Sequence, residues 1–170
     1  FGYKPNLFMK PSEDGSSIDI FKISNDEDYK KAKLNCLNLE REFIFEESIE
    51  GREFTVTIIG NKCYPVIEIK TQNDFYDYDA KYISDDTILD QAKLSDNELN
   101  IINDIALRAF HALKCSGWAR VDIIQDINGN FNVIEINTVP GMTSHSCVPK
   151  SGGFMGLSYQ DVIKEILRNV

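Results

Sequence analysis

The chain has 170 residues, of which 42% are hydrophobic and 11% aromatic, enough for a packed core in one domain or one and a half. Its formal net charge of -9 argues against a nucleic-acid partner, because binding to phosphate backbones depends on clustered Lys and Arg. No apolar run reaches the roughly 20 residues that a membrane crossing needs, so we expect a cytoplasmic protein without membrane insertion.

The first third of the chain alternates between strand and helix signals. Residues Leu7 to Lys10 predict a strand, and the segment "PSEDGSSI" that follows predicts a loop rich in small residues. A capping-box spacing at Ser24 to Glu27 predicts the start of a helix. The segments "REFIFEE" and "EFTVTIIG" are typical of strands, and "CYPVIEIK" predicts a hairpin partner across Gly60 and Asn61.

The middle of the chain loses its periodicity and then regains it. From Thr71 to Lys93 no pattern persists, and a segment of this length in a compact domain is usually a functional or disordered loop. A second capping box at Ser95 to Glu98 predicts an amphipathic helix that Gly117 ends, and a last helix is predicted from about Ser158.

A predicted hairpin turns at Asn128 and Gly129. Counting outward from a two-residue turn pairs Ile127 with Asn130, Ile123 with Ile134, Asp122 with Glu135, Val121 with Ile136 and Arg120 with Asn137. Opposed residues share a face. One face is therefore apolar, and the other carries Arg120, Asp122, Glu135 and Asn137.

Two acids that face each other repel, which destabilises a sheet by a few tenths to about 1 kcal/mol. A divalent cation would offset the repulsion, because magnesium takes one or two carboxylates together with phosphate oxygens. Asp122, Glu135 and Asn137 are such a ligand set, with the Arg120 guanidinium beside them. The alternative is an ordinary solvated face, and a slip of one residue in register would remove the argument. The loop after Lys10 has two interpretations as well, a phosphate-binding loop or a surface turn.

Five segments, in chain order, resemble the D-alanine:D-alanine ligase family. They are "KPSEDGSSI", "FEESIEGREFTV", "FYDYDAKYIS", "GWARVDII" and "VIEINTVPGMTSHSCVPK". The resemblance implies an α+β fold of the ATP-grasp type, with antiparallel sheets flanked by helices. It implies part of a central subdomain at residues 1–60 and a C-terminal subdomain at 61–170 with a lid loop at about 71–93. The N-terminal substrate domain of the family is expected to be absent.

The resemblance also implies an activity. Members join two D-alanine molecules, using ATP to convert one carboxylate to an acyl phosphate, for peptidoglycan synthesis. ATP, magnesium or manganese as two ions, and D-alanine are the expected ligands, and a homodimer of the full-length protein is left open. The residues present are expected to be a fragment with little activity alone. Two alternatives are another ATP-grasp carboxylate-amine ligase and a non-catalytic nucleotide-binding remnant.

Roles carry over to matching positions as implications of the resemblance. The cofactor-binding residues would be Lys10, Ser16, Ser17 and Lys81 at phosphates, Glu46 at adenine and Glu53 at ribose. The catalytic residues would be Arg120, the Gly141 backbone N–H, Ser146 at the second D-alanine and Tyr82 in the lid. The metal ligands would be Asp122, Glu135 and Asn137. Asp19 departs from the family, which generally has glycine there, so the geometry of that loop is expected to differ.

Overall fold

The computed structural model describes residues 6–13, 19–36, 41–70 and 87–170. The chain divides into two compact units, and the division falls between Ile49 and Glu50, not at the expected boundary of residues 60 and 61. The reason is strand β4 (Gly51–Ile59), which pairs with strands of the second unit over its whole length. We call the first unit the small unit and the second, which contains Glu50–Lys70 and Thr87–Val170, the large unit.

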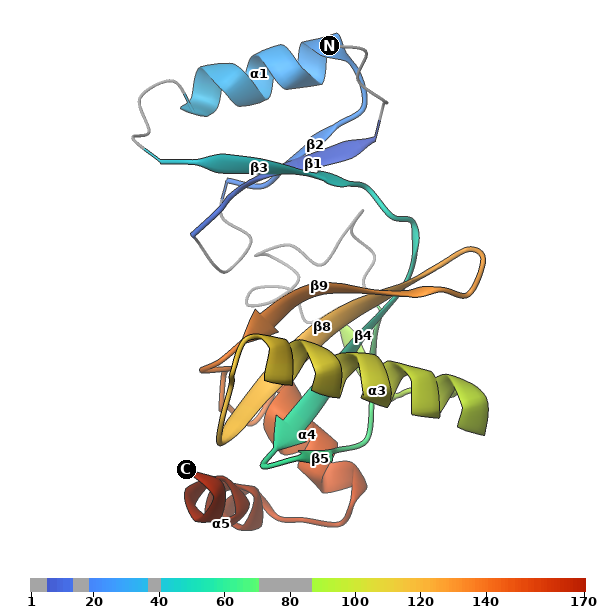
Figure 1. Cartoon of the computed structure of the whole chain (residues 1–170), viewed down its shortest axis with the longest axis vertical. Helices are drawn as coiled ribbons and strands as arrows, with labels where there is room; N and C mark the ends of the chain where they lie inside the picture. Colours follow the sequence, from blue (N-terminus) through green and yellow to red (C-terminus); the bar gives the residue numbers. More distant parts are fainter. Residues whose placement is uncertain (1–5, 14–18, 37–40, 71–86) are drawn as a thin grey trace. The chain divides into compact units, whose positions relative to one another are not determined.

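The small unit contains a three-stranded antiparallel sheet and one helix. Its elements are β1 (Leu7–Pro11), β2 (Phe21–Ile23), α1 (Asp26–Cys36) and β3 (Phe43–Glu47), with the strand order β2-β1-β3. Helix α1 lies along one face of the sheet (Figure 1), where its Ala32 packs with Met9 and Ile23. Because side chains alternate along a strand, Lys10 and Glu46 project from the other face.

The large unit contains a six-stranded antiparallel sheet and three helices among the described residues. Its elements are β4, β5 (Lys62–Cys63), β6 (Ile67–Lys70), β7 (Ile88–Gln91), α3 (Asp96–Ala112), β8 (Trp118–Asp126), β9 (Phe131–Asn137), α4 (Cys147–Phe154) and α5 (Tyr159–Asn169). The strand order is β7-β6-β4-β8-β9, with β5 paired to β4. The polar face predicted for the hairpin therefore belongs to the middle and edge of one sheet.

Helix α3 covers one face of this sheet (Figure 1). It begins with the predicted capping box, in which the Ser95 side chain accepts from the Glu98 backbone and the Glu98 side chain accepts from Ser95. Its Ile102, Ala106 and Phe110 are at most 1% exposed and pack on alternate residues of the central strands. Burial of the large apolar side chains of this core is the main stabilising contribution to the unit. Each of them contributes about 1.5 to 3 kcal/mol.

Helices α4 and α5 pack together with the end of β4 around Ile59, Val148 and Val162. A Cβ atom on Gly152 would lie 2.3 Å from the Val162 side chain, so only glycine permits the approach of α4 to α5. The sequence did not predict α4, because Pro149 and two glycines give the segment low helix propensity. Pro149 is tolerated because it lies in the first turn, where its missing N–H has no helical partner.

The predicted hairpin pairs β8 with β9, and its turn differs from the expectation. The pairs Arg120 with Asn137, Val121 with Ile136 and Asp122 with Glu135 are confirmed. The pairs nearer the turn are wrong, since Ile123 faces Val133 and the Asp126 N–H donates to the Asn130 carbonyl. The turn thus has three residues, and a bulge between Asp122 and Ile123 restores the register.

The chemistry of the turn explains the difference. The Asp126 carboxylate accepts hydrogen bonds from the backbone N–H groups of Asn128 and Asn130, at 2.9 and 2.8 Å. Gly129 has φ 85°, the left-handed conformation that closes a three-residue turn. The bulge leaves Ile134 38% exposed, so this residue does not join the apolar face as predicted. Phe131 is 9% exposed and packs in the core with Phe54.

Two further features complete the fold. Strand β7 occupies Ile88–Gln91, within the range of about 71–93 that was expected to be a lid loop; residues 71–86 lie outside the described part. Within the described residues, no helix is long and apolar enough to cross a membrane.

Candidate functional site

The polar face of the large sheet carries a connected cluster of side chains, opposite the face that α3 covers. Asp122 lies at its centre and is only 8% exposed. Arg120 binds it in a fork, with Nε donating to Oδ1 at 2.9 Å and Nη2 to Oδ2 at 2.8 Å. Thr55 on β4 donates its hydroxyl to Oδ1 at 2.6 Å. Charge-assisted bonds of this kind are about twice as strong as neutral ones, so the carboxylate is held in one orientation.

The two acids of the cluster are joined by an amide. Asn137 Nδ2 donates to Asp122 Oδ2 at 3.0 Å and to Glu135 Oε1 at 3.3 Å. The sheet register brings these three groups together, because Asp122 faces Glu135 and Arg120 faces Asn137 across the ladder. The expected repulsion between the acids is therefore reduced here by Arg120 and by the shared amide donor.

The donor set fits a hard divalent cation. Two carboxylates lie together on neighbouring strands, and rotation of the Asn137 amide, whose Nδ2 now faces both acids, would add its oxygen; magnesium prefers oxygen ligands completed by water and phosphate. Among the described residues no group of three or more His, Cys, Asp or Glu side chains could hold a metal ion. A cation at this face would therefore depend on Asn137 and on ligand oxygens as well as on the two acids.

The loop after β9 places Gly141 beside Ser146. A Cβ atom on Gly141 would lie 3.0 Å from Ser146 Oγ. Ser146 Oγ accepts from the Thr143 backbone N–H at 3.0 Å and lies 2.9 Å from the Thr143 hydroxyl. Ser146 also precedes α4 as its N-cap residue, yet its side chain makes no capping bond. The serine hydroxyl is thus held within the loop.

Cys147 follows this loop as the first residue of α4. The thiol is 3% exposed, and burial raises its pKa to about 11, with smaller opposing influences from Arg120 and Asp122. The thiol therefore stays neutral at ordinary pH and acts as a packing group.

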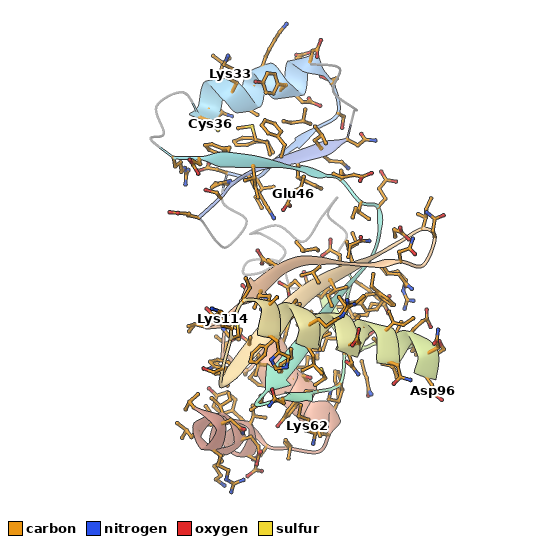
Figure 2. All side chains as sticks on the ribbon, viewed as in Figure 1. Lys33, Cys36, Glu46, Lys62, Asp96 and Lys114 are labelled. Carbon is orange, nitrogen blue, oxygen red and sulfur yellow. The ribbon has the colours of Figure 1, made fainter. Side chains whose placement is uncertain are left out.

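The remaining expected cofactor-binding residues are divided between the two units. Lys10 and Glu46 form an ion pair at 2.6 Å on the face of the small sheet opposite α1. Figure 2 shows Glu46 on the side of that sheet away from α1. Glu53 is half-buried on β4 of the large unit and alternates onto the same face as Thr55.

Four expected site residues lie outside the described part of the chain. They are Ser16, Ser17, Lys81 and Tyr82. The neighbouring Asp19 has φ 56°, a conformation that glycine adopts readily and aspartate tolerates better than most residues. Its carboxylate forms an ion pair with Arg41, and the guanidinium lies over the Phe43 ring. Aspartate at this position therefore keeps a backbone conformation that suits glycine.

Thr55 is the member of the cluster that the sequence did not reveal as functional. In "EFTVTIIG" the residue was assigned to a strand without a role. The available signal was the alternation of Glu53, Thr55 and Thr57 with apolar residues on β4, which indicates that one face of a central strand is polar. This alternation indicates a role for Thr55 only together with the pairing of β4 and β8, which places Thr55 opposite Asp122.

Comparisons with known proteins identify the family of this chain. The family model "D-ala D-ala ligase C-terminus" matches residues 3–168. A D-alanine–D-alanine ligase of Marinomonas sp. (strain MWYL1) is 42% identical over 166 residues, which are 96% of this chain and 52% of that protein. The chain spans about half the length of the curated relatives it matches.

Solved structures give the same result. The D-alanine–D-alanine ligase from Bacillus anthracis complexed with ATP matches 98% of this chain and 52% of its own, with a TM-score of 0.81 and 28% identity. The VanG D-Ala:D-Ser ligase from Enterococcus faecalis matches 98% of this chain and 50% of its own, with a TM-score of 0.84 and 30% identity. The predicted α+β fold of the ATP-grasp type is confirmed. The chain belongs to the D-alanine–D-alanine ligase family and corresponds to its C-terminal part.

Proposed function

We propose that this chain is the nucleotide- and metal-binding part of an ATP-dependent ligase that joins two D-alanine molecules for peptidoglycan synthesis. The observation that carries the proposal is the cluster of Arg120, Asp122, Glu135 and Asn137 on one sheet face in a chain of this family. Relatives named D-alanine–D-alanine ligase at 39 to 42% identity support the substrate, and the ATP complex of a structural neighbour supports the nucleotide. The comparisons give no support to the two alternative functions.

The proposed reaction has two steps. A carboxylate oxygen of the first D-alanine attacks the γ-phosphorus of ATP, the bond to ADP breaks, and an acyl phosphate forms. The amine of the second D-alanine then attacks the carbonyl carbon, loses a proton, and phosphate leaves with the electrons of the C–O bond. Negative charge develops on oxygen in both steps, so the protein must place positive groups and N–H donors at those oxygens.

The residues of the cluster have proposed roles in these steps. Asp122, Glu135 and Asn137 would hold magnesium or manganese, which when bound neutralises triphosphate charge. The Arg120 guanidinium, fixed by its fork to Asp122, would face the oxygen that becomes negative, together with the Gly141 N–H. Ser146 would donate to the carboxylate of the second D-alanine. Most of the catalysis would then come from positioning and electrostatics.

Roles for the nucleotide follow the same logic. Lys10 would exchange its ion pair with Glu46 for the ATP phosphates, while Glu46 and Glu53 would accept from adenine and ribose. Ser16, Ser17, Lys81 and Tyr82 remain expected participants from the sequence. Of the described residues among these, Lys10 and Glu46 belong to the small unit and Glu53 to the large unit.

The test is ADP formation by the full-length protein with magnesium, measured in a coupled assay with D-alanine, D-serine and D-lactate offered singly and in pairs with D-alanine. We expect D-alanine alone to stimulate ADP release and to yield the dipeptide. Stimulation only by the pair of D-alanine and D-serine would move the function to that of the VanG neighbour. Absence of stimulation by any D-amino acid would contradict the proposed function.

A further inference from the structure

Thr55 is buried beside the expected metal ligands, and no role has been assigned to it so far. It is 1% exposed and lies on the central strand β4, directly opposite Asp122 on β8. Its hydroxyl reaches Asp122 Oδ1 at 2.6 Å, while the alternative acceptor, the Val121 carbonyl, is at 3.4 Å. The short distance shows that the hydroxyl proton points to the carboxylate.

The donors around Asp122 distinguish its two oxygen atoms. Oδ1 accepts from Thr55 and from Arg120 Nε. Oδ2 accepts from Arg120 Nη2 and from Asn137, the residue whose amide also reaches Glu135. Oδ2 is therefore the oxygen that faces the other two expected ligands, Glu135 and Asn137. Oδ1 faces the neighbouring strand β4.

A cation that binds at Oδ2 would displace the Asn137 N–H from that oxygen, because a metal and a proton donor compete for the same lone pairs. The Thr55 hydroxyl lies at the other oxygen and does not compete. It is also neutral, so it orients the carboxylate without adding positive charge near the cation. Groups that orient a ligand in this way commonly change metal affinity by 10- to 100-fold when removed.

We propose that Thr55 is a positioning residue that fixes Asp122 so that Oδ2 faces the divalent cation. The inference rests on the proposed metal-binding role of Asp122. Thr55 acts through Asp122 and does not itself contact the metal or substrate. The hydroxyl, and not the methyl group, is the part of the side chain that performs this role.

The same strand contains a matched control in Thr57. It lies two residues along β4 on the same face and is also 1% exposed. Its hydroxyl has no hydrogen-bond partner among the residues that the structure describes. A change of either threonine to valine removes one hydroxyl and keeps the branched shape, so the two variants differ in the bond to Asp122.

The experiment measures Mn²⁺ binding to the full-length protein with a non-hydrolysable ATP analogue, using the EPR signal of free Mn²⁺ so that no turnover is needed. The variants are Thr55→Val, Thr55→Ser, Thr57→Val and Asp122→Asn, each first shown to be folded by thermal unfolding. We expect Thr55→Val to weaken Mn²⁺ binding about 10-fold. We expect Thr55→Ser, which keeps the hydroxyl, and Thr57→Val to stay within about 3-fold of the unmodified protein, well below the effect of losing an orienting group.

The possible outcomes distinguish the role of Thr55 from the proposed metal-binding role of Asp122. Equal Mn²⁺ affinity in Thr55→Val and Thr57→Val, with Asp122→Asn impaired, would overturn the role of Thr55 and leave the metal site in place. Impaired binding in Thr55→Ser as strong as in Thr55→Val would also overturn it, since packing would then be responsible. Unchanged binding in Asp122→Asn would overturn the metal site itself and the inference with it.

Discussion

The two sheets of the molecule present their polar groups in different ways. On the large sheet the side chains of Arg120 and Asp122 are 14% and 11% exposed, and Asp122 accepts bonds from three side chains. On the small sheet Lys10 and Glu46 form a single ion pair with side chains 16% and 40% exposed. A buried, fully bonded cluster fixes its geometry before any ligand arrives. An ion pair in which one partner is exposed, as Glu46 is, contributes about 0 to 1 kcal/mol and exchanges partners more readily. The large sheet is thus suited to orient reacting groups, and the small sheet to bind and release a ligand.

The largest effect is expected from Arg120→Lys on the large sheet. Lysine keeps the charge and loses the planar fork that contacts both oxygens of Asp122. We expect kcat to fall by roughly 100- to 1,000-fold, the usual effect of losing a group that stabilises developing charge, while KM for D-alanine changes little. Steady-state kinetics of the full-length protein measure both.

The control for this variant is Arg108→Lys. Arg108 forms an exposed ion pair with Asp104 on α3, so its replacement makes the same chemical change on the helix that covers the other face of the sheet, and it is expected to leave kcat unchanged. A kcat for Arg120→Lys equal to that of the control would show that the guanidinium has no role in the reaction, and the contrast between the two sheets would lose its functional meaning.

An intermediate effect is expected from Lys10→Met on the small sheet. A charged hydrogen bond to phosphate contributes about 1.5 to 3 kcal/mol, so KM for ATP should rise by roughly 10- to 100-fold with kcat less affected. Lys33→Met is the control, since Lys33 lies on α1 on the other side of the sheet from Glu46 (Figure 2). An unchanged KM in Lys10→Met would leave this ion pair as a structural contact only.

The smallest effect is expected from Ser95→Ala, which weakens the large unit without touching its cluster. Loss of the N-cap hydrogen bond should lower the free energy of unfolding by about 1 kcal/mol at pH 7, with kcat and both KM values unchanged. Chemical denaturation measures the first quantity. A fall in kcat as large as that of Arg120→Lys would show that the activity reports stability of the unit and not the geometry of the cluster.

The pH dependence of this variant has a defined sign. Hydrogen bonds from Ser95, with help from Gln125, lower the pKa of Glu98 from 4.5 to about 2. A carboxylate whose pKa is lowered by folding stabilises the folded state at any pH above its pKa in the unfolded chain. This contribution to the free energy of unfolding is lost as the pH falls from about 4.5 towards 2. The difference in stability between Ser95→Ala and the unmodified protein should therefore shrink as pH falls through that range.

The strand register at Arg120 and Asp122 was predicted correctly from the sequence, partly by chance. Counting from a two-residue turn gave the right partners for Arg120 and Asp122. The actual turn has three residues because the Asp126 carboxylate caps it, and the bulge adds back one residue on β9. The longer turn and the bulge shift the register by one residue in opposite directions. The register at the cluster is therefore the one expected, while the residue pairs between the bulge and the turn are shifted by one residue. Local turn chemistry of this kind is hard to count from sequence alone.

Other parts of the site depended on packing between distant segments. Thr55 gained its meaning from the pairing of β4 with β8, which no local pattern specifies. Helix α4 forms because Gly152 fits closely against Val162 on α5, although the segment has weak helix propensity. Helix α3, in contrast, was predictable, since its capping box and apolar spacing are local signals that agree with its burial.

We propose above that one face of the hairpin, next to β4 in the same sheet, holds a divalent cation between Asp122, Glu135 and Asn137. The most direct measurement is a crystal structure of the full-length protein with Mn²⁺ and a non-hydrolysable ATP analogue, with the anomalous signal of manganese recorded. The account predicts an anomalous peak within about 2.0 to 2.3 Å of an oxygen atom of each of the three side chains. Bound nucleotide whose manganese peak lies away from all three, with the bonds from Asn137 to Asp122 and Glu135 still intact, would contradict it.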